Sequence, residues 1–204
     1  MKSIIAIVLL AFSMLAQAGE SLSSQVFKEM ESYRTVLLKQ AGPFQRSLVV
    51  DELVETMELH DVDVKVSTHP IAGGAVYYPG VIIIGSDLAS LPREQVAFVL
   101  AHEYGHHTRT HWQSTLSRGA GLARQQGKAL HTLAELDVFI NEAATPEANY
   151  NDELDADRAA ATLLKRCGVF DVNAIIKLFQ LIGSEDATST HPGSARRIQA
   201  VRGQ

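Results

Sequence analysis

Apolar residues in the first part of the chain repeat with helical spacing. Ser24–Gln40 is amphipathic and stops at Gly42-Pro43. The segment Phe44–His60 then places four apolar side chains on one stripe of a helix, namely Leu48, Leu53, Val54 and Met57. We therefore expect two helices, over Ser24–Gln40 and Phe44–His60.

The period then changes to strict alternation. Valines alternate with charged residues over Val62–Val66, which predicts a half-buried strand. Ala75–Tyr78 and Val81–Ile84 are short β-rich runs joined by Pro79-Gly80, a pair that suits a type II turn. We expect a hairpin in which the wholly apolar Val81–Ile84 is the inner strand and Ala75–Tyr78 is an edge.

Helical patterns fill the rest of the chain. Leu91–Glu94 opens the next expected helix, with Pro92 in its first turn. Gln95–Ala101 is a nearly uninterrupted apolar run, which predicts that this helix is buried as it runs toward Trp112. Ser114–Glu142 is weakly helical and interrupted by glycines. The remaining expectations are a loop at Thr145–Tyr150, a helix from the cap Asn151 to Gly168, a helix from Asp171 to Gly183, a polar loop at Ser184–Ser194 and a short helix at Ala195–Arg202. Helices around a small sheet predict an α+β fold.

Composition limits the classes of partner. The 204 residues are 46% hydrophobic and 20% charged, as in ordinary globular domains. A net charge of −5 with scattered basic residues argues against nucleic acid as a partner. Cys167 is the single cysteine, so no internal disulfide can form, and we interpret it as a small packing residue.

The N-terminal residues 1–18 have the pattern of a secretory signal peptide. Lys2 precedes the apolar run Ile4–Leu15, which is short for a membrane anchor, and Ala16-Gln17-Ala18 is a small-x-small cleavage site. No cysteine follows the run to accept a lipid, and no second apolar segment has membrane length. We expect an exported, soluble product, most simply periplasmic, with one domain over residues 19–204.

His102-Glu103-Tyr104-Gly105-His106 is the most informative motif in the chain. On a helix, residues His102 and His106 are four apart and share a face, so both imidazoles can bind one Zn²⁺. Glu103 is badly placed to be a ligand but can reach a metal-bound water as a general base. Because the preceding run predicts a buried helix, these polar groups need partners, and a metal supplies them.

A catalytic zinc site needs a third protein ligand and one open position. Glu153 and Asp157 are four apart on one helix face, where a polar segment becomes apolar. We expect Glu153 to bind the metal and Asp157 to accept a hydrogen bond from the free ring N–H of a ligand histidine. The alternative is Asp157 as the ligand with Glu153 as its support.

Three motifs, in order along the chain, resemble the M48 family of zinc metallopeptidases, whose members include HtpX-type catalytic domains. They are His102-Glu103-Tyr104-Gly105-His106 with His111 (HExxHxxxxH), Glu153-Leu154-Asp155-Ala156-Asp157-Arg158 (ExxAD(R)), and Thr190-His191-Pro192 with Arg197-Ile198 (THP…RI). The resemblance covers roughly Val62 to Val201. It implies a zincin-like (gluzincin) domain, mostly helical, with a small sheet or hairpin beside the active-site helix. The best comparison is a stand-alone, soluble periplasmic member.

The resemblance also implies site roles. One zinc ion per chain would be held by His102, His106 and Glu153. His191 would lie in a loop over the cleft, where it either donates to the oxyanion of the tetrahedral intermediate or occupies the open metal position and keeps the enzyme latent. We expect Arg197 to pair with an acidic residue near the site. His111 is expected to be a packing or second-layer residue and His107 a solvent or interface histidine.

These inferences predict a zinc-dependent endopeptidase. Zinc lowers the pKa of its bound water, and Glu103 takes the proton and passes it to the leaving amine. An extended substrate would pair with the edge strand Ala75–Tyr78, a mode that needs an unfolded or flexible segment, so misfolded envelope proteins are a sensible substrate class. The rival hypothesis is a non-catalytic or latent zinc-binding chaperone or assembly factor, with the metal site plugged by His191.

Overall fold

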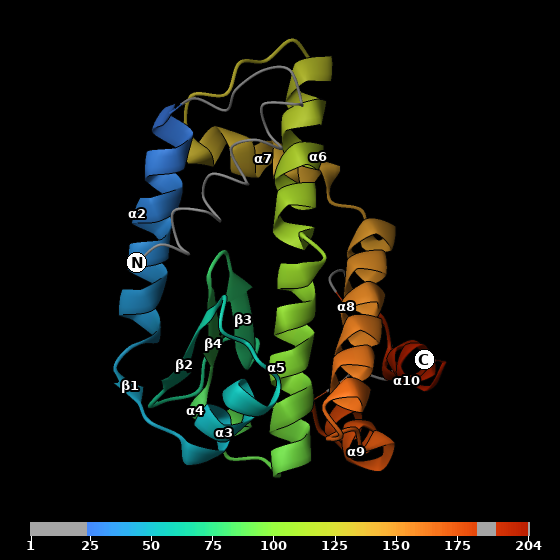
Figure 1. Ribbon diagram of the computed structural model, residues 1–204. Helices are drawn as coiled ribbons and strands as arrows, with labels where there is room; N and C mark the ends of the chain where they lie inside the picture. Colours follow the sequence, from blue (N-terminus) through green and yellow to red (C-terminus); the bar gives the residue numbers. More distant parts are fainter. Residues whose placement is uncertain (1–23, 183–190, 204) are drawn as a thin grey trace. The chain divides into compact units, whose positions relative to one another are not determined.

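The computed structural model describes residues 24–182 and 191–203 (Figure 1). The described residues divide into two compact units: residues 24–40 with 110–145, and residues 41–109 with 146–182 and 191–203. The expected signal peptide, residues 1–18, and most of the expected polar loop, residues 184–190, lie outside the described residues.

A mixed sheet of four strands organises the second unit, in the order β1-β2-β4-β3. β2 (Asp63–Ser67) and β4 (Val81–Ile84) run parallel. β3 (Ala75–Tyr78) pairs with β4 as an antiparallel hairpin, and Gly80 between them has the positive φ that a type II turn requires. The predicted hairpin is confirmed, with β4 inside the sheet and fully buried and β3 at its edge.

The helix expected over Phe44–His60 is shorter than predicted. Its first residues form the short strand β1 (Phe44–Gln45), which pairs antiparallel with β2. Ser47 then caps α3 (Leu48–Thr56), because its hydroxyl accepts a hydrogen bond from the backbone N–H of Val50 at 3.4 Å. Glu58 has a φ of 56°, which no α-helix can continue through.

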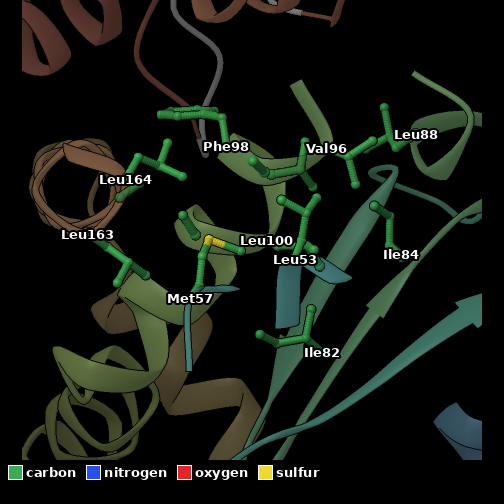
Figure 2. Close-up of a cluster of buried hydrophobic side chains, with 14 of the residues drawn as sticks. Leu53, Met57, Ile82, Ile84, Leu88, Val96, Phe98, Leu100, Leu163 and Leu164 are labelled. Atoms are coloured by element: carbon green, nitrogen blue, oxygen red, sulfur yellow. The ribbon is translucent and has the colours of Figure 1, made fainter. Parts of the chain in front are cut away.

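Helices pack beside this sheet around one apolar core. α4 (Ser86–Ala89) follows β4, and α5 (Arg93–Thr108) packs against β3, β4 and α8. As predicted, the stretch Gln95–Ala101 of α5 is buried. Figure 2 shows core side chains of α3 and its C-cap residue, β4, α4, α5 and α8 that point toward one another: Leu53, Met57, Ile82, Ile84, Leu88, Val96, Phe98, Leu100, Leu163 and Leu164.

Three further helices lie in the described part of the second unit. α8 (Pro146–Arg166) begins where a loop was expected, and Asn151 lies inside it rather than capping it. The reason is Pro146, whose fixed φ and missing N–H suit the first helical position. α9 (Val172–Ile182) is capped by Asp171, and α10 (Ser194–Arg202) packs against α8 and α9. The expected α+β class is confirmed.

Helices alone make up the described part of the first unit: α2 (Ser24–Ala41), α6 (His111–Gln125) and α7 (Leu133–Ala143). Buried Leu116 and Leu136 centre a small core between α6 and α7. Gly119, which weakened the helical prediction, lies inside α6, where a Cβ would come within 2.7 Å of the Ile140 side chain. That glycine therefore permits close packing of α7.

The helix that carries the histidine motif ends sooner than expected. It was predicted to run toward Trp112, but Thr110 adopts the left-handed conformation (φ 56°), and His111 starts α6. Within residues 24–182 and 191–203, no helix has the length and apolarity needed to cross a membrane.

Candidate metal centre

The last two turns of α5 hold the first two candidate ligands. His102 and His106 lie on one face of this helix, with their Nε2 atoms 3.2 Å apart. His102 is 8% exposed, and His106 is half-buried. A single helix therefore places two imidazole nitrogens close enough together to bind the same metal ion.

Glu153 reaches the same point from α8. Its Oε2 lies 3.5 Å from Nε2 of His102, and its Oε1 lies 3.3 Å from Nε2 of His106. One ligand atom from each of the three residues lies within 4.8 Å of the others, and the carboxylate is buried. The structure thus brings together the three residues that the sequence proposed as ligands.

Gly105 explains how α8 can come so close to α5. A Cβ at this position would lie 2.8 Å from the backbone oxygen of Ala156, closer than real Cβ atoms approach. A glycine inside a helix costs about 1 kcal/mol relative to alanine, so a packing reason is expected for it. Here the absence of a side chain lets α8 pack directly against the motif.

Asp157 and Arg197 fix the orientation of the first histidine. The fully buried Asp157 carboxylate accepts a hydrogen bond from Nδ1 of His102 at 2.9 Å. Arg197 of α10 donates to both oxygens of the same carboxylate, Nη2 at 2.7 Å and Nε at 2.8 Å. Because Nδ1 carries the donated proton, a neutral His102 turns the lone pair of Nε2 toward Glu153 and His106.

Strong electrostatic coupling follows from this burial. Burial alone would lower the pKa of His102, but hydrogen bonds to Asp157 and Glu153 outweigh it and raise the pKa to about 10. Burial opposes ionisation of Glu153, yet the surrounding imidazoles hold the pKa of its carboxyl well below the ordinary value. Arg197 and His102 likewise overcome burial and depress the pKa of Asp157. In the metal-free protein the two buried carboxylates are therefore ionised and are balanced by Arg197 and by a protonated His102, whose proton a metal ion would replace.

The donor set fits zinc. Two imidazole nitrogens and one carboxylate are typical zinc ligands in catalytic sites. Tetrahedral coordination with bonds of about 2.0–2.1 Å places two ligand atoms about 3.3 Å apart. The two imidazole nitrogens are 3.2 Å apart, and each lies 3.3–3.5 Å from one oxygen of Glu153, Oε1 for His106 and Oε2 for His102. These residues could therefore hold the metal with little rearrangement.

Glu103 and His191 are the other two predicted site residues. Glu103 follows His102 on α5 and is half-buried. Burial opposes ionisation of Arg197, but Asp157, Glu153 and, least of the three, Glu103 raise its pKa. Nδ1 of His191 lies 2.9 Å from Oε2 of Glu153, and its side chain is 56% exposed. His191 therefore contacts a candidate ligand directly while remaining open to solvent.

Sequence reasoning missed a second hydrogen-bonded group on α5. His107 was expected to face solvent or an interface, but its side chain is only 13% exposed. Its Nε2 lies 2.9 Å from Oδ2 of Asp61, and its Nδ1 lies 3.0 Å from the hydroxyl of Tyr77 in β3. No local sequence pattern predicts this group, because its three members are far apart in the sequence.

Fold and site together define a class of protein. An α+β fold in which a His-Glu-x-x-His helix meets a glutamate from a second helix is zincin-like. The family model for Peptidase family M48 matches residues 41–204, and the chain belongs to this family of zinc-dependent peptidases. The search of curated proteins found no match.

Proposed function

We propose that the chain is a zinc-dependent endopeptidase that cleaves unfolded or misfolded envelope proteins. The observation that carries this proposal is the convergence of His102, His106 and Glu153 from two helices, beside a glutamate that is not part of the cluster. A purely structural zinc site is typically closed by four protein ligands and has no use for such a base. Membership of a peptidase family supports the same reaction.

In this proposal His102, His106 and Glu153 hold one Zn²⁺ per chain. When bound, the metal would polarise the scissile carbonyl and lower the pKa of a water molecule. Asp157 holds His102 in the tautomer that leaves Nε2 free, and Arg197 holds Asp157 in place. These supports come from α8 and α10.

Proton transfer is the role we propose for Glu103. Glu103 directly follows His102 on α5 and is a half-buried residue, which supports this role. Glu103 would take a proton from the attacking water and pass it to the amine that leaves. A single carboxylate thus serves both proton transfers.

His191 has two candidate roles that its contact with Glu153 supports equally. In the first it donates to the oxygen that becomes negative as the peptide carbonyl is attacked, so His191→Ala lowers the cleavage rate. In the second it holds the site latent, and the same substitution raises the rate. The sign of the change separates them.

We propose that the substrate binds as an extended strand along β3. Within the described sheet β3 is an edge strand beside α5, so a peptide can add to it through backbone hydrogen bonds. Only unfolded or flexible segments can do this. The envelope location, with export to the periplasm, is proposed from the N-terminal pattern of residues 1–18 alone.

Cleavage of casein by the purified mature chain, beside Glu103→Gln, tests this function, with bound zinc measured on both proteins. We expect the wild type to cleave and the variant to keep its zinc but lose activity by at least about a hundredfold. If both proteins hold zinc and neither cleaves, the rival, a latent or non-catalytic zinc protein, is favoured.

A further inference from the structure

A hydrogen-bonded chain joins α5 to the edge strand. The Asp61 carboxylate can only accept, so Nε2 of His107, 2.9 Å away, carries a proton. In the neutral imidazole Nδ1 then accepts from the Tyr77 hydroxyl, which lies 3.0 Å away. Tyr77 therefore donates to His107, and His107 donates to Asp61.

Aromatic packing holds these hydrogen-bonded side chains in place. The His107 ring lies edge-on to the Tyr77 ring, with centroids 5.6 Å apart, and beside the Tyr104 ring at 5.5 Å. Burial first, and the charge of Asp61 second, raise the pKa of the Tyr77 hydroxyl, so it stays protonated and can donate. A histidine that merely lay at the surface would have neither the neighbouring aromatic rings nor hydrogen-bond partners at both ring nitrogens.

These hydrogen-bonded side chains connect the strand that we propose binds substrate to the helix that carries the proposed base. His107 is four residues after Glu103, so both side chains lie on the same face of α5, one turn apart. Tyr77 belongs to β3, the strand along which we propose that the substrate extends. The Tyr77–His107 hydrogen bond thus ties the strand that would align the peptide to the helix that would cleave it.

We propose that His107 is a positioning residue that, through Tyr77 and Asp61, fixes β3 relative to α5 and so sets how an extended peptide lies against Glu103. This inference rests on the proposed peptidase function. His107 touches neither substrate nor metal in this role, and its effect passes through the strand. Loss of the hydrogen bond would loosen the substrate site and leave the metal centre intact.

Peptide affinity is the readout that separates positioning from catalysis. In the inert, zinc-loaded Glu103→Gln background, we expect Tyr77→Phe to weaken binding of a fluorescent casein peptide about three- to tenfold, the range for one lost hydrogen bond. In the active enzyme the same substitution should raise KM by a similar factor with little change in kcat. Zinc content should stay at the wild-type level.

Two substitutions of His107 sharpen the test. Asn places a polar atom near the position of Nδ1, which faces Tyr77, whereas Gln places one near Nε2, which faces Asp61. We expect His107→Asn to keep more peptide affinity than His107→Gln. Tyr33→Phe on α2 and His131→Asn before α7 remove the same kinds of group elsewhere and serve as controls.

The inference is overturned if Tyr77→Phe leaves both the peptide affinity and KM at wild-type values, or if the parent Glu103→Gln protein does not bind the peptide. A fall in kcat at constant KM would also overturn it, since that pattern indicates a catalytic rather than a positioning role. Failure of the proposed function has a different signature, because a zinc-loaded wild type would then not cleave casein at all.

Discussion

At the scale of single residues, Gly105 shows how one missing side chain permits a site. The backbone of Ala156 lies so close that a Cβ at Gly105 would be 2.8 Å from its oxygen. Backbone cannot move aside as the end of a flexible side chain can, so α8 would have to shift. Because Glu153 is carried by α8, that shift would act on the ligand set.

Gly105→Ala should therefore destabilise the protein by about 1–3 kcal/mol, the usual cost of overpacking, and should weaken zinc binding. Urea unfolding and zinc titration measure the two effects. Gly121→Ala is the matched control, because a Cβ added at that helical glycine would meet nothing beyond its own helix within 4 Å, and the change should stabilise by up to about 1 kcal/mol. Equal effects of the two substitutions would contradict the close-packing account.

Asp157→Asn tests the support of His102. Removing the charge leaves the Arg197 guanidinium with only the more distant carboxylate of Glu153, 3.9 Å away. We expect a loss of about 3–5 kcal/mol in the metal-free protein and about 10–100-fold weaker zinc binding. On the same helix, Asp155 pairs with Arg109 at 3.6 Å with both side chains well exposed. Asp155→Asn should cost less than about 1 kcal/mol, and a comparable loss at both positions would count against the buried pair.

The sequence revealed the site residues that lie close together along the chain and not those that lie far apart. The histidine motif was readable because its members share one helical turn, and Glu153 and Asp157 were readable as a pair for the same reason. Their separate roles stayed open, because spacing alone does not say which carboxylate lies nearer the imidazoles. The partnership of His107 with Tyr77 and Asp61 required the tertiary structure and was missed.

At the scale of elements, α7 depends on its first turn. Thr132 and Glu135 form a capping box, in which the Thr132 hydroxyl accepts from the backbone N–H of Glu135. The Glu135 carboxylate in turn accepts from the backbone N–H groups of His131 and Thr132, at 2.7 and 3.0 Å. These backbone donors, His131 first, lower the pKa of Glu135.

The stability contributed by this cap should depend on pH. A carboxyl whose pKa is lowered on folding stabilises the folded state above its ordinary pKa, and that contribution is lost as pH falls through the lowered pKa. The difference in unfolding free energy between wild type and Glu135→Ala should thus be larger at pH 7 than at about pH 3. Urea unfolding at both pH values measures it, and a difference that does not change with pH would contradict the charged cap.

Elements with strong local signals were predicted well, and those set by tertiary contacts were not. The β3–β4 hairpin followed from its turn residues and apolar inner strand. By contrast, β1 exists because Phe44 and Gln45 pair with β2, and nothing in their own pattern separated them from the helix that follows. The early start of α8 was missed because Thr145–Tyr150 looks like a loop, although Pro146 is a good first helical residue.

At the scale of the whole molecule, the second unit joins the sheet, the motif helix and the glutamate helix into one metal centre. The family match over residues 41–204 includes every proposed ligand and support. A bound metal would tie α5 to α8, so zinc should stabilise this unit as any ligand of the folded state does. The central claim is that His102, His106 and Glu153 together hold that metal.

Zinc content measured by atomic emission on the wild type, Glu153→Ala and Glu147→Ala, with folding checked by circular dichroism, tests that claim most directly. Glu147 is an exposed glutamate in the first turn of the same helix and serves as the matched control. We expect one zinc per chain in the wild type and Glu147→Ala, and loss of zinc in a folded Glu153→Ala. A folded Glu153→Ala that retains one tightly bound zinc would contradict the claim.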